Sequence, residues 1–355
     1  MQADQLVDDI YEAGVLPERW VDVLDSLAKV ADCRGALLFA EIPYGSDLVC
    51  SPAIKEFIAT WAASPWGQDN PRRKYLVPRR DPRFLTERDG VPDEVVRADP
   101  YYDFMRDWGL GWCVGTAIRP YSAETIVLSI ERDFEKGPVP EDIVGELDRL
   151  RPHLARASVL ATRLGIEKAR AKVAALETIG LPAAIVSRTG RVVAANTLMQ
   201  GLSPALRIGA FDQLHLAGGA AALLRAALGA EPAGMAGCSI PLRGDETRPP
   251  AIVHVVPLRG RGRDIFSGAT SMLYVTALTR KKAPPGELLQ ALFDLTPAEA
   301  QVARAIVEGA GVDQIAQSRS VRPDTVRAEL KSVFAKTGIN RQADLVAILG
   351  SALLR

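Results

Sequence analysis

Cysteine and histidine are scarce in this sequence, and they are not grouped. The residues concerned are Cys33, Cys50, Cys113, Cys238, His153, His215 and His254. Zinc sites and disulfide frameworks need such residues at short, regular spacings, and the chain has no Cys-x-x-Cys pair. The sequence therefore predicts no metal site, no disulfide framework and no bound cofactor.

Long apolar runs are absent as well. No segment reaches the roughly 18 to 20 consecutive apolar residues that cross a bilayer. The N-terminal residues 1–15 are acidic and have neither the basic nor the apolar region of a secretory signal. By elimination we expect a cytoplasmic protein without a membrane partner.

Sequence motifs of common enzymes are also missing. The chain has no Gly-x-Ser-x-Gly, no His-Glu-x-x-His, no Walker loop and no strand-linked Gly-x-Gly-x-x-Gly. Residues 259–263 form a basic segment whose glycines have the wrong spacing for a dinucleotide fingerprint. With three histidines and no paired-carboxylate motif, we expect no catalytic residue and no enzymatic activity.

The chain has no excess of charge of either sign. Lys and Arg together number 43, as do Asp and Glu, so the formal net charge is zero. This balance excludes the globally basic character of small proteins that coat nucleic acids. Hydrophobic residues make up 48% and charged residues 24%, which is typical of a globular protein with a core. At about 150 residues per domain, 355 residues predict two or three domains.

Residues 1–140 are predicted to form a first α+β domain with a small antiparallel sheet. Apolar residues at helical spacing from Leu6 to Leu27 indicate two short helices that separate at Pro17. The strand-like runs are residues 35–42, 114–118 and 125–130. Residues 64–100 are rich in Pro, Arg and Asp, which predicts a long surface loop with short helical pieces.

Residues 141–178 are predicted to form a helical linker with a heptad repeat. The apolar or small residues at alternating steps of four and three are Ile143, Leu147, Leu150, Leu154, Ala157, Ala161 and Leu164. Pro152 is expected to kink this helix or to begin a new one, because its ring clashes with the carbonyl group four residues earlier. Two interpretations remain open. The helix lies on its own domain, or it pairs two chains.

Residues 179–280 are predicted to form a second α+β domain. Residues 183–187 and 191–196 have the pattern of two strands joined as a hairpin, and a helix is expected at residues 220–228. Three further strands are predicted at residues 237–242, 251–258 and 271–278. The segment from Glu177 to Gln200 resembles the start of a PAS domain, which implies a sensory sheet.

After a Pro- and Gly-containing linker at residues 280–286, residues 281–355 are predicted to form an all-α domain. The expected helices run from the capping box of Thr296 and Glu299 to near Gly309, from Val312 to Ser318, from Pro323 to about Lys336, and from near Arg341 onward. Two short helices, a tight turn and a longer third helix are the plan of a helix-turn-helix domain.

The C-terminal residues 295–349 resemble the DNA-binding domain of LuxR-type transcription regulators. The matching stretches are Leu295-Thr-Pro-Ala-Glu299, Gln314-Ile-Ala316, Ser320-Val-x-Pro-x-Thr-Val326, Lys336-Thr-Gly338 and Arg341-Gln-Ala-Asp-Leu-Val346. The resemblance implies that the third helix enters the major groove of double-stranded DNA.

Individual roles follow from matching the third helix to the family pattern. Arg327, Ala328 and Lys331 are implied to face the base edges, since Arg327 and Lys331 are four residues apart on one helical face. Thr325 and Lys336 are implied to lie near the sugar–phosphate backbone. Further phosphate contacts, on grounds of charge alone, are predicted for Arg322 and Arg341.

Glu329 departs from the family pattern, because many members carry histidine at this position. A carboxylate repels phosphate. It can instead accept a hydrogen bond from a cytosine amino group, or bridge to a neighbouring basic side chain. The sequence alone reveals no operator sequence.

The first domain resembles GAF-like or PAS-like sensors. A phosphoacceptor receiver is disfavoured, because residues 35–42 are not followed by the acidic cluster that a receiver needs. An acyl-homoserine-lactone domain is an alternative interpretation of the first domain. Such a domain needs Trp, Tyr and Asp residues, and residues of these types, among them Asp99, are present here. The candidate ligand-binding aromatic residues are Trp61, Trp66, Tyr75, Tyr101, Tyr102, Phe104, Trp108 and Trp112. The competing interpretation is that these aromatic residues form an ordinary core.

These observations lead to one expected function and two alternatives. We expect a dimeric, DNA-binding transcription regulator that a small molecule controls through an N-terminal sensor domain. One alternative is a ligand-independent regulator whose N-terminal domains serve dimerisation or protein docking. The other is an acyl-homoserine-lactone quorum-sensing receptor. Between Arg319 and Arg341 there are six basic and two acidic residues, a modest patch that predicts weak binding by one chain and hence a homodimer.

Overall fold

The computed structural model describes residues 2–40, 48–67, 69–79, 81–119, 125–229, 237–245, 248–258, 265–266, 268–278 and 283–349. Contacts divide the chain into two units, and the C-terminal helices belong to the second. The expected loop at residues 259–263, the end of the strand at 41–42 and the linker residues 280–282 lie outside the described residues. In the described part of the chain, no helix is long and apolar enough to cross a membrane.

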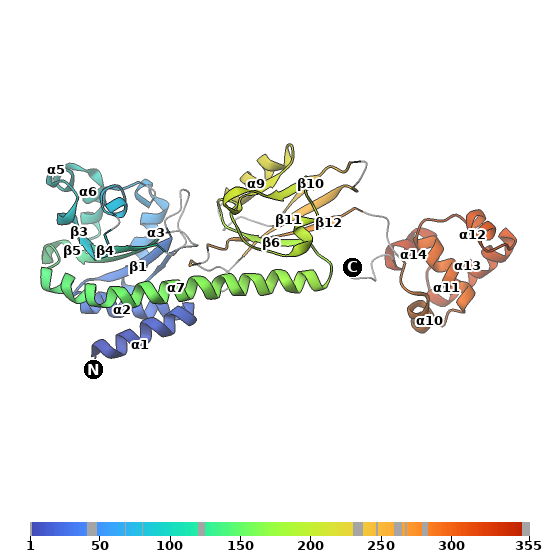
Figure 1. The fold of residues 1–355 in the computed structure, drawn as a ribbon, viewed down its shortest axis with the longest axis horizontal. Coiled ribbons are helices and arrows are strands. Elements are labelled where there is room, and N and C mark those ends of the chain that lie inside the picture. The colour runs from blue at the N-terminus through green and yellow to red at the C-terminus, as the bar shows by residue number, and fades with distance from the viewer. Residues whose placement is uncertain are drawn as a thin grey trace. The chain divides into compact units, whose positions relative to one another are not determined.

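The first sheet has the strand order β2-β1-β5-β4-β3 (Figure 1). Its strands are β1 (Gly35–Ala40), β2 (Leu48–Cys50), β3 (Leu85–Thr86), β4 (Leu110–Ile118) and β5 (Ile126–Asp133). Neighbouring strands are antiparallel throughout this sheet. The three expected strands are confirmed as β1, β4 and β5. The edge strands β2 and β3 are too short to show a period-two pattern, so the sequence did not predict them.

Helices cover both faces of this sheet. One face packs against α1 (Gln2–Val15), α2 (Trp20–Val30) and α7 (Glu141–Thr178). The other face packs against α3 (Lys55–Ala63), α4 (Pro71–Tyr75) and α6 (Pro100–Asp107). Along β5, Ile126 and Ile130 are buried in the first core, whereas Ser129 and Glu131 face a cavity on the opposite side. This alternation follows from the period of two in a strand.

The segment expected to be a long surface loop, residues 64–100, has a different role in the structure. It contains α4, β3, α5 (Asp93–Ala98) and several 3-10 turns, as predicted for short helical pieces. The expectation of a surface loop is wrong at Arg72 and Glu87, however, whose side chains are 8% and 3% exposed. These two charges leave water because they pair with each other.

The long helix α7 runs as one helix from Glu141 to Thr178 with Pro152 inside it, so no new helix begins at Pro152. Five residues of the heptad seam are buried in the core of the first domain. They are Leu147, Leu150, Leu154, Ala157 and Ala161. The interpretation that the helix lies on its own domain is therefore confirmed. These five side chains are therefore not available to a second chain, and pairing of two chains through the rest of residues 141–178 stays a prediction.

The second sheet has the order β10-β11-β12-β6-β7. Its strands are β6 (Ala183–Val186), β7 (Val192–Ala195), β10 (Cys238–Leu242), β11 (Ala251–Pro257) and β12 (Ser271–Ala277). When the five strands of each sheet are numbered in chain order within that sheet, the two sheets have the same strand order. The remaining elements are α8 (Thr197–Gln200), β8 (Leu206–Ile208), β9 (Leu214–Leu216) and α9 (Ala220–Gly229). The expected hairpin, helix and three strands are confirmed.

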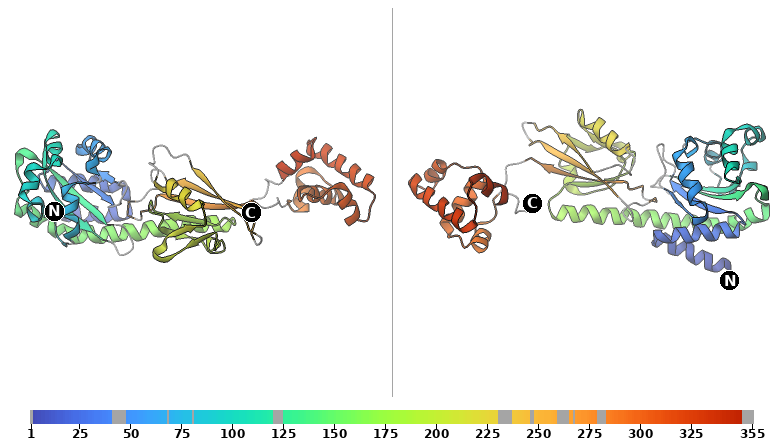
Figure 2. Two further views of the ribbon diagram at one scale, coloured as in Figure 1. Left: turned by 90° about the horizontal axis from the view of Figure 1, so that it is seen from above. Right: turned by 180° about the vertical axis from the view of Figure 1, so that it is seen from behind.

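The C-terminal part is all helical in its described residues (Figure 2). Its helices enclose one apolar core. Its helices are α10 (Gly286–Phe293), α11 (Pro297–Val307), α12 (Val312–Ser318), α13 (Pro323–Thr337) and α14 (Gln342–Leu349). The helices expected from the sequence are confirmed as α11 to α14. The first helix, α10, precedes the capping box and was not predicted.

Candidate functional sites

A tight turn joins α12 to α13. The amide of Val321 donates to the carbonyl oxygen of Ala316 at 3.0 Å, and Ser320 has a φ of 54°. Pro323 then occupies the first turn of α13, where its missing N–H costs no helical hydrogen bond. The sequence thus ends one helix and starts the next within a few residues, which holds α12 and α13 at a defined angle.

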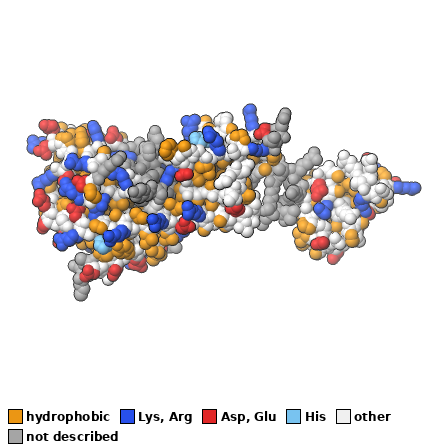
Figure 3. Space-filling view, viewed as in Figure 1, with side chains coloured by type: hydrophobic (Ala, Val, Ile, Leu, Met, Phe, Trp, Pro, Cys, Tyr) orange, Lys and Arg blue, Asp and Glu red, His pale blue; other side chains and the backbone are white. Residues whose placement is uncertain are grey.

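Helix α13 has one buried and one exposed face. Val326, Leu330 and Val333 are buried in the core of the C-terminal helices. All seven residues that the sequence assigned to DNA contact belong to the exposed class. They are Arg322, Thr325, Arg327, Ala328, Lys331, Lys336 and Arg341. In Figure 3, Lys and Arg side chains project from these helices among scattered Asp and Glu side chains.

Apart from Lys336, the basic groups of this face are only lightly engaged within the chain. Arg327 Nη1 lies 2.6 Å from Asp324 Oδ1, with side chains 61% and 88% exposed. Such an exposed pair contributes little and exchanges readily for another partner. Among the described residues, Arg322, Lys331 and Arg341 form no ion pair. Their charges are therefore available to an external anion.

Glu329, the residue that departs from the family pattern, forms a two-pronged ion pair with Arg319. Arg319 Nη1 lies 2.5 Å from Glu329 Oε2, and Arg319 Nη2 lies 3.1 Å from Glu329 Oε1. The two side chains are 21% and 20% exposed. The interpretation that Glu329 bridges to a neighbouring basic residue is confirmed. The pair ties the end of α12 to the middle of α13.

Lys336 connects the end of α13 to the start of α11. Its ammonium donates to Glu299 Oε2 at 2.7 Å and to the carbonyl oxygen of Asp294 at 2.9 Å. Glu299 also accepts from Ser332 Oγ at 2.6 Å and from the Thr296 amide at 2.7 Å, the latter within the predicted capping box. These donors, Lys336 first, lower the pKa of the Glu299 carboxyl to about 2. The sequence predicted the cap but not the link to Lys336.

The first α+β domain encloses a small cavity. Its volume is about 80 Å³, and its walls come from β1, α3, α4, α6, β4 and β5. Apolar side chains such as Leu37, Phe57 and Trp61 form much of the lining, while Glu131 and Ser129 supply polar groups from β5. An apolar wall with a few converging polar groups is the usual make-up of a ligand site.

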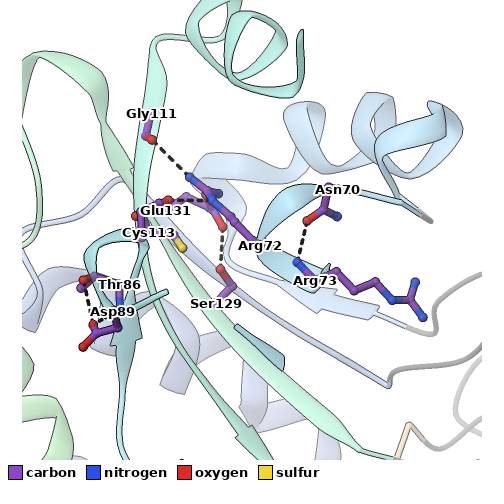
Figure 4. A network of polar contacts seen from close by, with 10 residues as sticks. Asn70, Arg72, Arg73, Thr86, Asp89, Gly111, Cys113, Ser129 and Glu131 are labelled. Carbon is purple, nitrogen blue, oxygen red and sulfur yellow. Dashed lines mark hydrogen bonds and ion pairs between the residues drawn. The ribbon is translucent and has the colours of Figure 1, made fainter. Parts of the chain in front are cut away.

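A buried ion network forms the polar side of this cavity (Figure 4). Arg72 Nε donates to Glu87 Oε1 and Arg72 Nη1 donates to Glu131 Oε2, both at 2.7 Å. Ser129 Oγ donates to Glu131 Oε1 at 2.7 Å, and the Cys113 amide donates to Glu87. Burial raises the pKa of the Cys113 thiol well above its ordinary value, so this thiol stays protonated. Two carboxylates thus surround one guanidinium.

The predicted aromatic residues are only partly brought together at the cavity. Trp61 and Tyr101 line it. Five others belong to the surrounding apolar cluster without being lining residues. They are Trp66, Tyr75, Tyr102, Phe104 and Trp108. The core interpretation is therefore confirmed for this cluster, and only two of the predicted aromatic residues line the cavity.

Trp112 is placed elsewhere. Its ring stacks on Phe134 with an interplanar angle of 2°, and its Nε1 donates to the Phe134 carbonyl oxygen at 3.2 Å. The strand period puts it on the face of β4 opposite to Cys113, so the structure does not support a lining role for Trp112. Asp99 caps α6, where its Oδ1 accepts from the Tyr101 amide at 2.9 Å.

The polar residues of the cavity were missed by sequence reasoning. In the sequence, Arg72 is 15 residues from Glu87 and 59 residues from Glu131. No local spacing connects these residues. Within the described residues, no group of three His, Cys, Asp or Glu side chains is arranged to hold a metal ion.

Comparisons with known proteins give only weak similarities. No protein-family model matches the chain, and no curated protein matches it. A crystal structure of Escherichia coli SdiA has 12% identity and a TM-score of 0.32, covering 95% of this chain and 92% of that one. The phage VqmA–DPO complex has 15% identity and a TM-score of 0.22, covering 53% and 94%. A Vibrio cholerae VqmA dimer, described as informative on DNA binding by LuxR-type receptors, has 13% identity and a TM-score of 0.21, covering 50% and 85%. At these scores the similarities are too weak to define the fold of this chain.

Proposed function

We propose that this chain is a transcription regulator of the LuxR type that binds double-stranded DNA through α13 and carries out no catalysis. The proposal rests on one observation, which is that α13 has one face buried in the core and one face exposed. Val326, Leu330 and Val333 anchor the helix in the core, and Arg327 and Lys331 project on its exposed side. A helix held in this way after a tight turn has the form of a recognition helix.

Each residue of the proposed DNA-contacting face has a distinct role. Arg327 and Lys331, with Ala328 between them, face the edges of the bases, where Arg and Lys recognise guanine. Thr325, Lys336, Arg322 and Arg341 contact the sugar–phosphate backbone and set the register. Lys336 reaches a phosphate only if it shares or leaves its contact with Glu299.

Useful affinity requires two chains. Six basic against two acidic residues between Arg319 and Arg341 make a small positive patch, and so few phosphate contacts give only weak binding by one chain. A homodimer places two α13 helices on half-sites about one helical turn apart. Because five side chains of the α7 seam are covered, we assign pairing to α14 as well as to the rest of residues 141–178, and on α14 Ile348 is 51% exposed.

The first domain acts as the sensor in this proposal. Both sheets have the same strand order, which supports the GAF-like or PAS-like interpretation of two related sensory domains. The cavity of about 80 Å³ is smaller than the roughly 300–1,000 Å³ of sites for drug-sized ligands. The effector is therefore a compact small molecule, and a long acyl chain fits only if the apolar cluster rearranges. Binding shifts the population of states that match the half-site spacing.

The DNA-binding part is tested with the full chain and a pool of random double-stranded oligonucleotides. We expect selection of a preferred sequence, and mobility-shift assays on that sequence give the affinities. The double variant Arg327→Ala with Lys331→Ala is expected to lose at least about tenfold in affinity. Arg304→Ala, an exposed change on α11, is the matched control. The same affinity and preference in the double variant would refute the assigned face.

The ligand-independent alternative predicts a different result in a ligand screen. Native mass spectrometry and thermal shifts over a metabolite panel detect a bound effector, since a ligand at a hundred times its Kd stabilises by about 2.7 kcal/mol. An effector of the first cavity should lose its effect in Glu131→Gln. A panel without any shift and without a co-purifying mass would favour docking domains.

A further inference from the structure

A second, larger cavity lies in the second α+β domain. Its volume is about 540 Å³, within the range typical of small-molecule sites. It is formed by the turn after β6, by β9 and by α9. The lining residues that matter here are Arg188, Gln213, His215, Leu224, Arg225 and Leu228.

The charge of this lining is of one sign. Arg188 and Arg225 carry positive charge, and His215 adds an imidazole ring. Among the described lining residues there is no Asp or Glu. In the first cavity, by contrast, Arg72 is already neutralised by two carboxylates. The two cavities therefore suit ligands of different charge.

Arg188 is the strongest indication of a ligand. Its Nε and Nη1 atoms are buried, and no hydrogen-bond acceptor within the described residues reaches either of them. A buried donor without an acceptor is unfavourable, and more so when it is charged. A guanidinium N–H group forms its strongest hydrogen bonds with the oxygens of a carboxylate or phosphate. Among the described lining residues, none supplies such a group.

The remaining lining describes the rest of the ligand. Leu224 and Leu228 from α9 and Leu214 from β9 are buried at the cavity wall, and they offer an apolar surface next to the guanidinium. Gln213 and Thr189 add neutral polar groups. We propose that the second domain binds a small organic anion, with Arg188 holding its carboxylate or phosphate group and the leucines holding a short apolar part.

The test uses the full chain, with titration calorimetry and thermal shifts at constant ionic strength. Benzoate and phenyl phosphate are the probes, and the comparison between them distinguishes a carboxylate site from a phosphate site. Benzamide is the neutral control. We expect one or both anions to bind and to raise the Tm, and benzamide to have no effect.

Variants assign the binding to the cavity. Arg188→Gln should weaken binding of the anion by about tenfold or more, because a charge-assisted hydrogen bond is lost. Arg225→Gln should weaken it by a smaller factor. Arg243→Gln, an exposed change away from the lining, is the matched control and should bind as the unchanged chain does. If circular dichroism shows that Arg188→Gln has lost its fold, the comparison of Arg225→Gln with Arg243→Gln decides whether the anion binds in the cavity.

Three results would overturn the proposal. The first is no binding of either anion at millimolar concentration. The second is equal binding of benzamide and benzoate. The third is an equal loss in Arg243→Gln and in the cavity variants, which would indicate general attraction to positive charge.

Discussion

The Lys336 ammonium lies 2.7 Å from a carboxylate oxygen of Glu299, and this contact ties the end of α13 to the start of α11. The same carboxylate caps α11 and accepts from Ser332 on α13. One side chain thereby fixes both the start of a helix and the orientation of the proposed recognition helix. Substitutions here should affect the stability of the C-terminal helices before they affect DNA contacts.

Glu299 gives a pH dependence whose direction is known. Its pKa is lowered to about 2 in the folded chain from an ordinary value near 4.5. A lowered folded pKa means that the stabilisation is complete above the unfolded pKa and is lost as pH falls from about 4.5 toward 2. In Glu299→Gln this acid-dependent loss should shrink. Thermal unfolding of the full chain between pH 6 and pH 3 measures it.

Lys336→Met provides the companion change, since it keeps the apolar stem and removes the charge. We expect a loss of about 1–2 kcal/mol in the free energy of unfolding of the C-terminal helices, because a charge-assisted hydrogen bond disappears. Arg304→Met on α11, whose pair with Glu308 is exposed and 3.8 Å long, is the control and should change stability by less than about 0.5 kcal/mol. Equal effects of the two variants would contradict the role assigned to the contact.

Glu329→Gln separates a bracing role from base recognition. If the ion pair with Arg319 orients α13, the variant should lower thermal stability and weaken binding to all DNA sequences by a similar factor. If Glu329 instead accepts from a cytosine, the preferred sequence should change at one position. Oligonucleotide selection with the unchanged protein and with Glu329→Gln distinguishes these outcomes. An altered preference with unchanged stability would argue against bracing.

The buried network of the first domain predicts strong non-additivity. Arg72→Met leaves Glu87 and Glu131 buried without their counter-charge and should destabilise the domain by about 3–5 kcal/mol. Adding Glu87→Gln and Glu131→Gln should restore much of that loss, because no unpaired charge then remains. Urea denaturation of the three chains measures the effect. A triple variant less stable than Arg72→Met would show that the carboxylates stabilise by other means.

Salt dependence distinguishes base contacts from phosphate contacts on α13. A side chain that neutralises one phosphate contributes about 0.9 to the slope of log affinity against log salt concentration. Arg341→Ala should therefore lower the slope by about one while leaving sequence preference unchanged. Arg327→Ala should relax the preference at one position. The reverse pattern in a salt titration would exchange the roles of these two residues.

The C-terminal helices illustrate how much a sequence reveals when its signals are local. The capping box of Thr296 and Glu299, the proline at the start of α13 and the helical period of its apolar residues act within a few residues of each other. They predicted α11 to α14 to within one or two residues of the observed bounds. The exposed face of α13 followed from the same period.

The first domain illustrates the opposite case. Its aromatic residues were recognised, but residue type does not tell which face of an element a side chain occupies. Trp61 and Tyr101 therefore line the cavity while Trp112 stacks on Phe134 outside it. The heptad period of α7 likewise does not tell what covers its apolar side chains, and in the structure five of them are buried in the core of the first domain.

The amino-acid sequence by itself determined that this chain has no excess charge, no grouped cysteines and a helix-turn-helix at its end, because these follow from composition and short spacings. Only the tertiary structure decided that Arg72 meets Glu131 across 59 residues of chain and that α7 lies on its own domain. It also decided that Arg188 lines a cavity whose described lining contains no Asp or Glu. The physical reason is that burial and charge pairing between distant segments depend on how the chain closes on itself, which no local pattern encodes.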